Sequence, residues 1–177
     1  MKTITSLVLA TSLCAMSLAR AAGHAHVHGI ASLDIAVEAH KLTLQLSVPL
    51  DNLLGFERAP RSDAERRQTD AVVAKLRQAD TVFRIDPAAR CQPAGVTLTS
   101  AALKLGTPDP EEAQEEGHAD IDASYEFTCA DGNRAAYVET SLFDFQRLQR
   151  LDVQIAGPSG QLKRTLKRPE RRILLSR

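Results

Sequence analysis

The chain has 177 residues, and its 22 basic and 22 acidic side chains give a formal net charge of zero. A neutral balance selects no polyanionic partner, so the bulk charge does not favour nucleic-acid binding. There is no tryptophan, and with only 2 tyrosines and 5 phenylalanines the case for a base-stacking or carbohydrate-binding platform is weak. The length fits one domain of ordinary size with a real hydrophobic core.

Residues 1–21 have the pattern of an export signal. A cationic Lys2 precedes an apolar run over 4–18, and Ala19-Arg20-Ala21 fits an A-x-A cleavage site. The apolar run is too short for a spanning helix of about 20 residues. We therefore expect a signal peptide over 1–21 that is cleaved on export, and a single periplasmic domain over 22–177 with no stable membrane insertion.

Three histidines alternate directly after this signal, at His24, His26 and His28. In an extended backbone, side chains two residues apart point to the same side and lie roughly 7 Å apart, so neighbouring imidazoles could share one ion. Imidazole is a good ligand for zinc, copper or nickel. The spacing predicts a metal site, and the alternative is a water-exposed terminal tail.

The first residues of the mature chain offer a second kind of site. Cleavage after Ala21 would leave Ala22-Gly23-His24 at the new N-terminus. A free amine, two backbone amides and an imidazole in this order can wrap a square-planar ion, a geometry that suits Cu²⁺ or Ni²⁺ rather than Zn²⁺. This alternative depends on the position of the cut, because cleavage one residue later removes it.

Two predicted strands follow the histidines. Apolar and polar residues alternate over 30–38 and again over 42–48, with a turn at 39–41 between them. Period two is typical of strands, so the two runs predict a β-hairpin. A short helical turn is expected over 51–56. Because the histidine row runs directly into the first strand, its last members are predicted to lie at a sheet edge.

The longest predicted helix begins at a capping box, Ser62-Asp63-Ala64-Glu65, and runs to about residue 79. Further strands are expected over 82–85 and 96–105. The segment 107–117 contains two prolines and five acids without a base. Such a composition cannot bury apolar area, which predicts a mobile acidic loop.

An amphipathic strand is predicted after the acidic segment, over 118–129. His118, Asp120 and Asp122 alternate on its polar side, and this imidazole and two carboxylates form a second set of candidate metal ligands. The alternative is an ordinary antiparallel strand with its polar side in water. The remaining predicted elements are strands over 137–140, 151–155, 161–166 and 173–175, and a short helix over 142–151.

Two cysteines remain after the predicted leader, Cys91 in a predicted loop and Cys129. An even number in an exported chain most simply means one disulfide. Both thiols could instead be metal ligands, but an oxidising compartment disfavours free thiolates. We therefore expect a disulfide with a structural role.

Together these elements predict an α+β fold, mainly an antiparallel sheet with one longer helix and one or two short helices. No G-x-S-x-G elbow and no H-E-x-x-H pair occurs, and no thiol is expected to stay reduced for nucleophilic chemistry. We therefore do not expect an enzyme. A hydrolytic zinc site that uses His118 is the one enzymatic alternative.

Four segments resemble, in the same order, a bacterial periplasmic family. They are HAHVHGIASLDIAVE, PLDNLLGFERAP, HADIDASYEFTC and LQRLDVQIAGPSGQ. The family is typified by the zinc-regulated accessory protein ZrgA, and its members look like periplasmic zinc-binding proteins that assist an ABC-type importer when zinc is scarce. The resemblance implies that Cys91 pairs with Cys129, and that the metal ligands come from His24, His26, His28, His118 and Asp120.

Two positions depart from the family pattern. Members often carry a long histidine-rich insert where this chain has Asp109 to Glu116, and carboxylates bind zinc less tightly than imidazoles do. Arg58 occupies the histidine position of the family's GFEHAP motif and cannot coordinate a metal. The sequence predicts a zinc-binding protein that assists an ABC-type importer. The alternatives are Cu²⁺ or Ni²⁺ binding through the N-terminus, or a metal-independent envelope scaffold.

Overall fold

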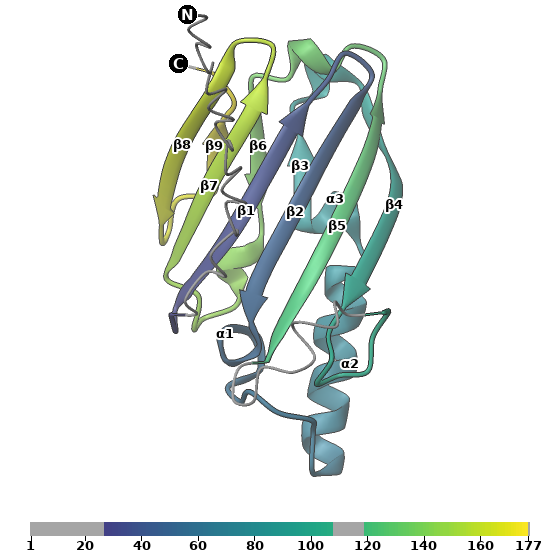
Figure 1. Ribbon diagram of the computed structural model, residues 1–177, viewed down its shortest axis with the longest axis vertical. Helices are drawn as coiled ribbons and strands as arrows, with labels where there is room; N and C mark the ends of the chain where they lie inside the picture. The colour runs from purple at the N-terminus through teal and green to yellow at the C-terminus, as the bar shows by residue number, and fades with distance from the viewer. Residues whose placement is uncertain (1–26, 108–118, 177) are drawn as a thin grey trace, which may run out of the picture.

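The computed structural model of the chain describes residues 27–107 and 119–176. A six-stranded sheet in the order β4–β5–β2–β1–β7–β8 forms one layer (Figure 1). Its strands are β1 (Ile30–Val37), β2 (Lys41–Pro49), β4 (Cys91–Thr99), β5 (Asp120–Cys129), β7 (Arg150–Gly157) and β8 (Gly160–Lys167). All neighbouring pairs are antiparallel except β1 and β7, which run parallel. The predicted mainly antiparallel sheet is confirmed in its larger part, and the parallel pair makes it mixed.

A second, antiparallel sheet in the order β3–β6–β9 lies behind the first in Figure 1. Its strands are β3 (Phe83–Ile85), β6 (Tyr137–Thr140) and β9 (Arg172–Leu174). The connections contain α1 (Leu50–Leu54), α2 (Asp63–Leu76), α3 (Ala79–Val82) and the 3-10 turns η1 (Pro87–Ala89), η3 (Gly132–Arg134) and η4 (Leu142–Asp144). One longer helix with two short ones agrees with the predicted α+β class. No helix within 27–107 and 119–176 has the length and apolar character needed to cross a membrane.

Apolar and polar residues alternate along the strands, so that one face of the large sheet packs into the core. In β2, Leu44 and Leu46 are buried, while Gln45 between them is exposed. The two sheets meet where Phe83 packs edge-on against Tyr125, with ring centroids 5.0 Å apart. The buried side chains of both sheets belong to one hydrophobic cluster. The period-two pattern in the sequence thus reflects a sheet with one buried face and one polar face.

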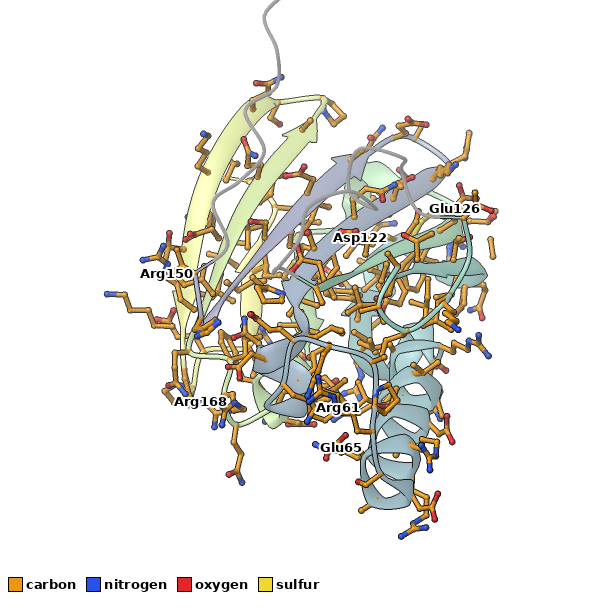
Figure 2. The ribbon with its side chains drawn as sticks, turned by 60° about the horizontal axis from the view of Figure 1, so that its bottom comes forward. Arg61, Glu65, Asp122, Glu126, Arg150 and Arg168 are labelled. Atoms are coloured by element: carbon orange, nitrogen blue, oxygen red, sulfur yellow. A yellow bond between two sulfur atoms is a disulfide. The ribbon has the colours of Figure 1, made fainter. Side chains whose placement is uncertain are left out.

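The predicted capping box is present at the start of α2. Ser62 Oγ accepts a hydrogen bond from the Glu65 N–H at 3.2 Å. The Glu65 carboxylate in turn accepts the Arg61 N–H at 2.6 Å, and Figure 2 shows these two residues beside each other at the start of the helix. The helix ends at Leu76, earlier than predicted, because Gln78 leaves the helical conformation with a ψ of 80°.

The strand predicted over 96–105 is wrong at both ends. β4 covers Cys91–Thr99 instead, so Cys91 lies in a strand rather than in the predicted loop. The chain then turns back on itself, and Ser100 pairs with Leu105 across an antiparallel bridge. Lys104, with a φ of +55°, provides the left-handed backbone that this reversal needs.

The helix predicted over 142–151 is also wrong, since the 3-10 turn η4 forms at the start of this range and β7 begins at Arg150. Phe143 and Leu148 are buried, as the predicted apolar stripe required. Their carbonyls, and that of Phe145, accept hydrogen bonds from the guanidinium of Arg168. Arg168 thus bonds the backbone of a segment that packs its apolar residues without becoming helical.

Cys91 and Cys129 form a disulfide, which confirms the predicted pairing. The bond joins the start of β4 to the end of β5, two neighbouring strands. Both sulfur atoms are taken in this oxidised form, so these residues are not thiolate metal ligands here. The disulfide lies at the end of the large sheet opposite to the end at which β1 and β5 begin.

Candidate metal centre

Two of the predicted ligand segments join the fold at the same end of the large sheet. β1 and β5 flank β2 and run antiparallel to it, so both begin where β2 ends (Figure 1). His28 lies two residues before β1, and Asp120 is the first residue of β5, paired with Pro49. Strands two places apart in a sheet lie about 10 Å from each other. The two segments therefore enter the sheet at the same end, one strand apart.

His28 contacts a carboxylate, Glu57, that is not among the ligand candidates predicted from the sequence. Its Nε2 lies 2.9 Å from Oε1 of Glu57, in the loop that follows α1. The His28 side chain is 66% exposed, and that of Glu57 only 19%. A surface imidazole thus rests against a half-buried carboxylate, and both are donor types that zinc accepts.

A buried amide fixes the point at which the histidine segment joins β1. Asn52, in α1, is 1% exposed. Its Oδ1 accepts the Gly29 N–H at 2.6 Å, and its Nδ2 donates to the Ile30 carbonyl at 2.7 Å. Gly29 has a φ of +82°, a conformation that favours glycine. Both polar atoms of the Asn52 amide therefore bond to the backbone directly after His28.

Asn52 in α1 and Glu57 in the loop after it contact the same chain segment, 28–30. Gly55 ends the helix in the left-handed conformation, with a φ of +83°, and turns the chain toward Glu57. On the same helix, Asp51 accepts a hydrogen bond of 2.9 Å from Arg147, which ties α1 to the segment before β7. The sequence signal for this arrangement is the segment PLDNLLGFERAP, which carries all of these residues except Arg147.

Arg58, the residue after Glu57, makes an ion pair with the start of α2. Its Nη1 and Nη2 each lie 2.9 Å from a carboxylate oxygen of Glu65. The guanidinium also lies over the ring of Phe56, 4.9 Å from its centroid. The hydrogen bonds from Arg58 are the main cause that lowers the pKa of Glu65 to about 2, and the bond from the Arg61 N–H is the second. This pair anchors the loop that carries Glu57.

Asp120 lies beside the start of α1. Its backbone carbonyl accepts a hydrogen bond of 2.6 Å from Ser100 Oγ. The carbonyl of the preceding residue, Ala119, accepts the Leu50 N–H at 2.8 Å. The start of β5 is therefore tied to the same short helix that holds Gly29. Asp122 follows on the same strand (Figure 2).

The fifth histidine, His40, lies at the opposite end of the sheet, in the turn between β1 and β2. Its carbonyl accepts the Cys129 N–H at 2.9 Å, next to the disulfide. His40 therefore belongs to neither predicted ligand set, and it provides a natural control for both.

Several predicted features lie outside residues 27–107 and 119–176. They are the signal peptide over 1–21, the acidic segment over 107–117 apart from Thr107, and the ligand candidates His24, His26 and His118. Within the part of the chain that the structure describes, no three His, Cys, Asp or Glu side chains gather closely enough to hold a metal ion. His28 and Glu57 are in contact there, and a four-coordinate zinc ion needs further ligands from outside this pair. The ligand roles of the other histidines stay predictions.

A family model described as ZrgA family zinc uptake protein matches residues 25–175. The chain belongs to this family. The resemblance seen in the four sequence segments is thereby confirmed, and membership in the ZrgA family associates the chain with zinc uptake. His28, Glu57, Asp120 and both disulfide cysteines lie within the match to the ZrgA family. No curated protein matches the chain.

Proposed function

We propose that this protein binds Zn²⁺ in the periplasm and assists zinc acquisition by an ABC-type importer. Membership of a zinc uptake family over residues 25–175 supports the choice of ion. The Cys91–Cys129 disulfide supports export, because such bonds persist in oxidising compartments such as the periplasm. In this proposal, residues 1–21 are a signal peptide that is removed on export, and the mature chain is a binding protein without catalytic activity.

The observation that carries the proposal is the contact between His28 and Glu57, at the end of the sheet where β1 and β5 begin. The proposed site adds other side chains from the same two chain segments, namely His24, His26, His118 and Asp120. Imidazoles and carboxylates are the donors that zinc sites of this kind use. Because imidazole binds a metal only in its neutral form, zinc affinity should fall as the pH drops below about 6.5.

A competition titration tests the proposal, with a zinc indicator and the metal-stripped mature protein. We expect tight binding that is lost when His24, His26, His28 and His118 are all replaced with Ala. His40→Ala is the matched control, since this histidine lies at the other end of the sheet, and it should leave the affinity unchanged. Binding no tighter than millimolar, or binding that survives the fourfold replacement, would show that the proposal is wrong.

The same titration with Cu²⁺ and Ni²⁺ separates the proposal from its rivals. A chelate at Ala22-Gly23-His24 would still bind these ions after His26, His28 and His118 are replaced with Ala, and the mass of the mature protein shows whether the chain starts at Ala22 as that chelate requires. A metal-independent scaffold predicts the same melting temperature with and without zinc, whereas an ion that binds the native state raises it.

A further inference from the structure

Glu57 stands out among the carboxylates because of the side chain it contacts. Its Oε1 lies 2.9 Å from Nε2 of His28, although the two residues are 29 positions apart in the chain. Glu57 is the more buried partner, with its side chain 19% exposed against 66% for His28. The Glu57 carboxylate is thus partly buried and contacts one particular histidine. A surface carboxylate that is fully solvated makes no such contact.

The loop around Glu57 is held on both sides. On one side, Gly55 ends α1 in the left-handed conformation, with its N–H bonded to the Asp51 carbonyl at 2.9 Å. On the other side, Arg58 makes two bonds of 2.9 Å to the Glu65 carboxylate. The carboxylate position is therefore set by α1 and α2 before any metal is bound. His28 adapts to it.

We propose that Glu57 is a positioning residue of the zinc site, which fixes the tautomer and orientation of His28; this rests on the proposed zinc-binding function. An ionised carboxylate only accepts hydrogen bonds, so a neutral His28 bonded to it must carry its proton on Nε2. The lone pair is then on Nδ1, which is left to bind the metal. Metal-binding histidines commonly donate their second ring N–H to a carboxylate in this way.

The distance fits a hydrogen bond between the two groups rather than two ligands that already stand apart for one ion. Two donors on one tetrahedral zinc ion, each at about 2.0 Å, lie roughly 3.3 Å from each other. The 2.9 Å between His28 Nε2 and Glu57 Oε1 is a normal hydrogen-bond distance and shorter than that separation. The two groups would have to separate to admit an ion between them, whereas Nδ1 coordination leaves their contact intact.

Zinc affinity of three variants provides the first test. Glu57→Ala removes the carboxylate and should weaken zinc binding about 10- to 100-fold. Glu57→Gln keeps an oxygen that accepts the Nε2–H, so its loss should be smaller. Glu126→Gln is the matched control, because Glu126 pairs with Lys41 at 2.9 Å farther along β5 from the proposed site (Figure 2), and its affinity should equal that of the wild type. Equal melting temperatures of the metal-free proteins would exclude a folding defect.

Nitrogen-15 NMR of the histidine rings shows which ring nitrogen of His28 carries the proton. Glu57 would not affect this if it only stabilised the fold. We expect the metal-free wild type to show His28 with its proton on Nε2, Glu57→Ala to show a mixture of tautomers, and zinc to shift Nδ1. Zinc on Nε2, or an unchanged zinc affinity in Glu57→Ala, would overturn the positioning role while the proposed function stands. Failure of the wild type to bind zinc would instead refute the proposed function.

Discussion

Asn52 allows a direct test of how the histidine segment is attached to the sheet. Asn52→Ala removes the acceptor of the Gly29 N–H and the donor to the Ile30 carbonyl, two bonds of 2.6 and 2.7 Å. The side chain is 1% exposed, so water does not readily replace it. A backbone group left without its partner costs about 1 to 3 kcal/mol, and both groups here are partly buried. We expect the free energy of unfolding to fall by about 2 to 4 kcal/mol.

The assay is urea unfolding of the metal-free, disulfide-bonded protein, followed by circular dichroism. Asn133→Ala is the matched control, since it makes the same change at an exposed position, and it should stay within about 0.5 kcal/mol of the wild type. Asn52→Asp keeps an acceptor for Gly29 but loses the donor to Ile30, so it should also be destabilised. A loss below about 0.5 kcal/mol in Asn52→Ala would refute the role of these two bonds.

The other predictions concern single contacts elsewhere in the fold. The Tyr125 hydroxyl is buried without a hydrogen-bond partner among the described residues, so Tyr125→Phe should leave the free energy of unfolding unchanged or raise it by up to about 1 kcal/mol; a clear loss in urea unfolding would contradict this. Replacing both Cys91 and Cys129 with Ser should cost about 4 kcal/mol of stability, given their separation of 38 residues, without changing the zinc dissociation constant, because the disulfide lies at the opposite end of the sheet. The pKa of Glu65 is about 2 in the fold against an ordinary 4.5, so its ionised form stabilises the protein fully above pH 4.5 and this contribution is lost as the pH falls toward 2. Glu65→Gln should therefore flatten the acid side of a plot of stability against pH, and an unchanged plot would count against the Arg58 pair.

Elements that depend on patterns among residues close together in the chain were predictable from the sequence. Period-two alternation over 30–48 predicts the hairpin of β1 and β2, because the pleat of a strand imposes that period on its own residues. The capping box from Ser62 to Glu65 predicts the start of α2 for the same reason, since it joins residues three positions apart. The prediction over 96–105 failed because apolar alternation does not record the left-handed backbone at Lys104.

Contacts between distant segments were not predictable in this way. The parallel pairing of β1 with β7 has no signal in either strand alone. The histidines could be named as candidates because imidazole is a ligand wherever it lies. The partners of their segment could not, because Asn52 and Glu57 reach Gly29 and His28 only through the turn of α1. The sequence therefore names candidate ligands of the proposed site but not the residues that hold their segment in place.

X-ray absorption at the zinc edge, on protein loaded with one equivalent of zinc, tests most directly whether imidazoles at the shared start of β1 and β5 hold the ion. Imidazole nitrogens at about 2.0 Å and the outer atoms of their rings give a signal that water and carboxylates do not. We predict a ligand shell containing imidazoles that loses one of them in His28→Ala and none in His40→Ala. A shell made only of oxygen, or a spectrum that His28→Ala does not change, would contradict the proposed site.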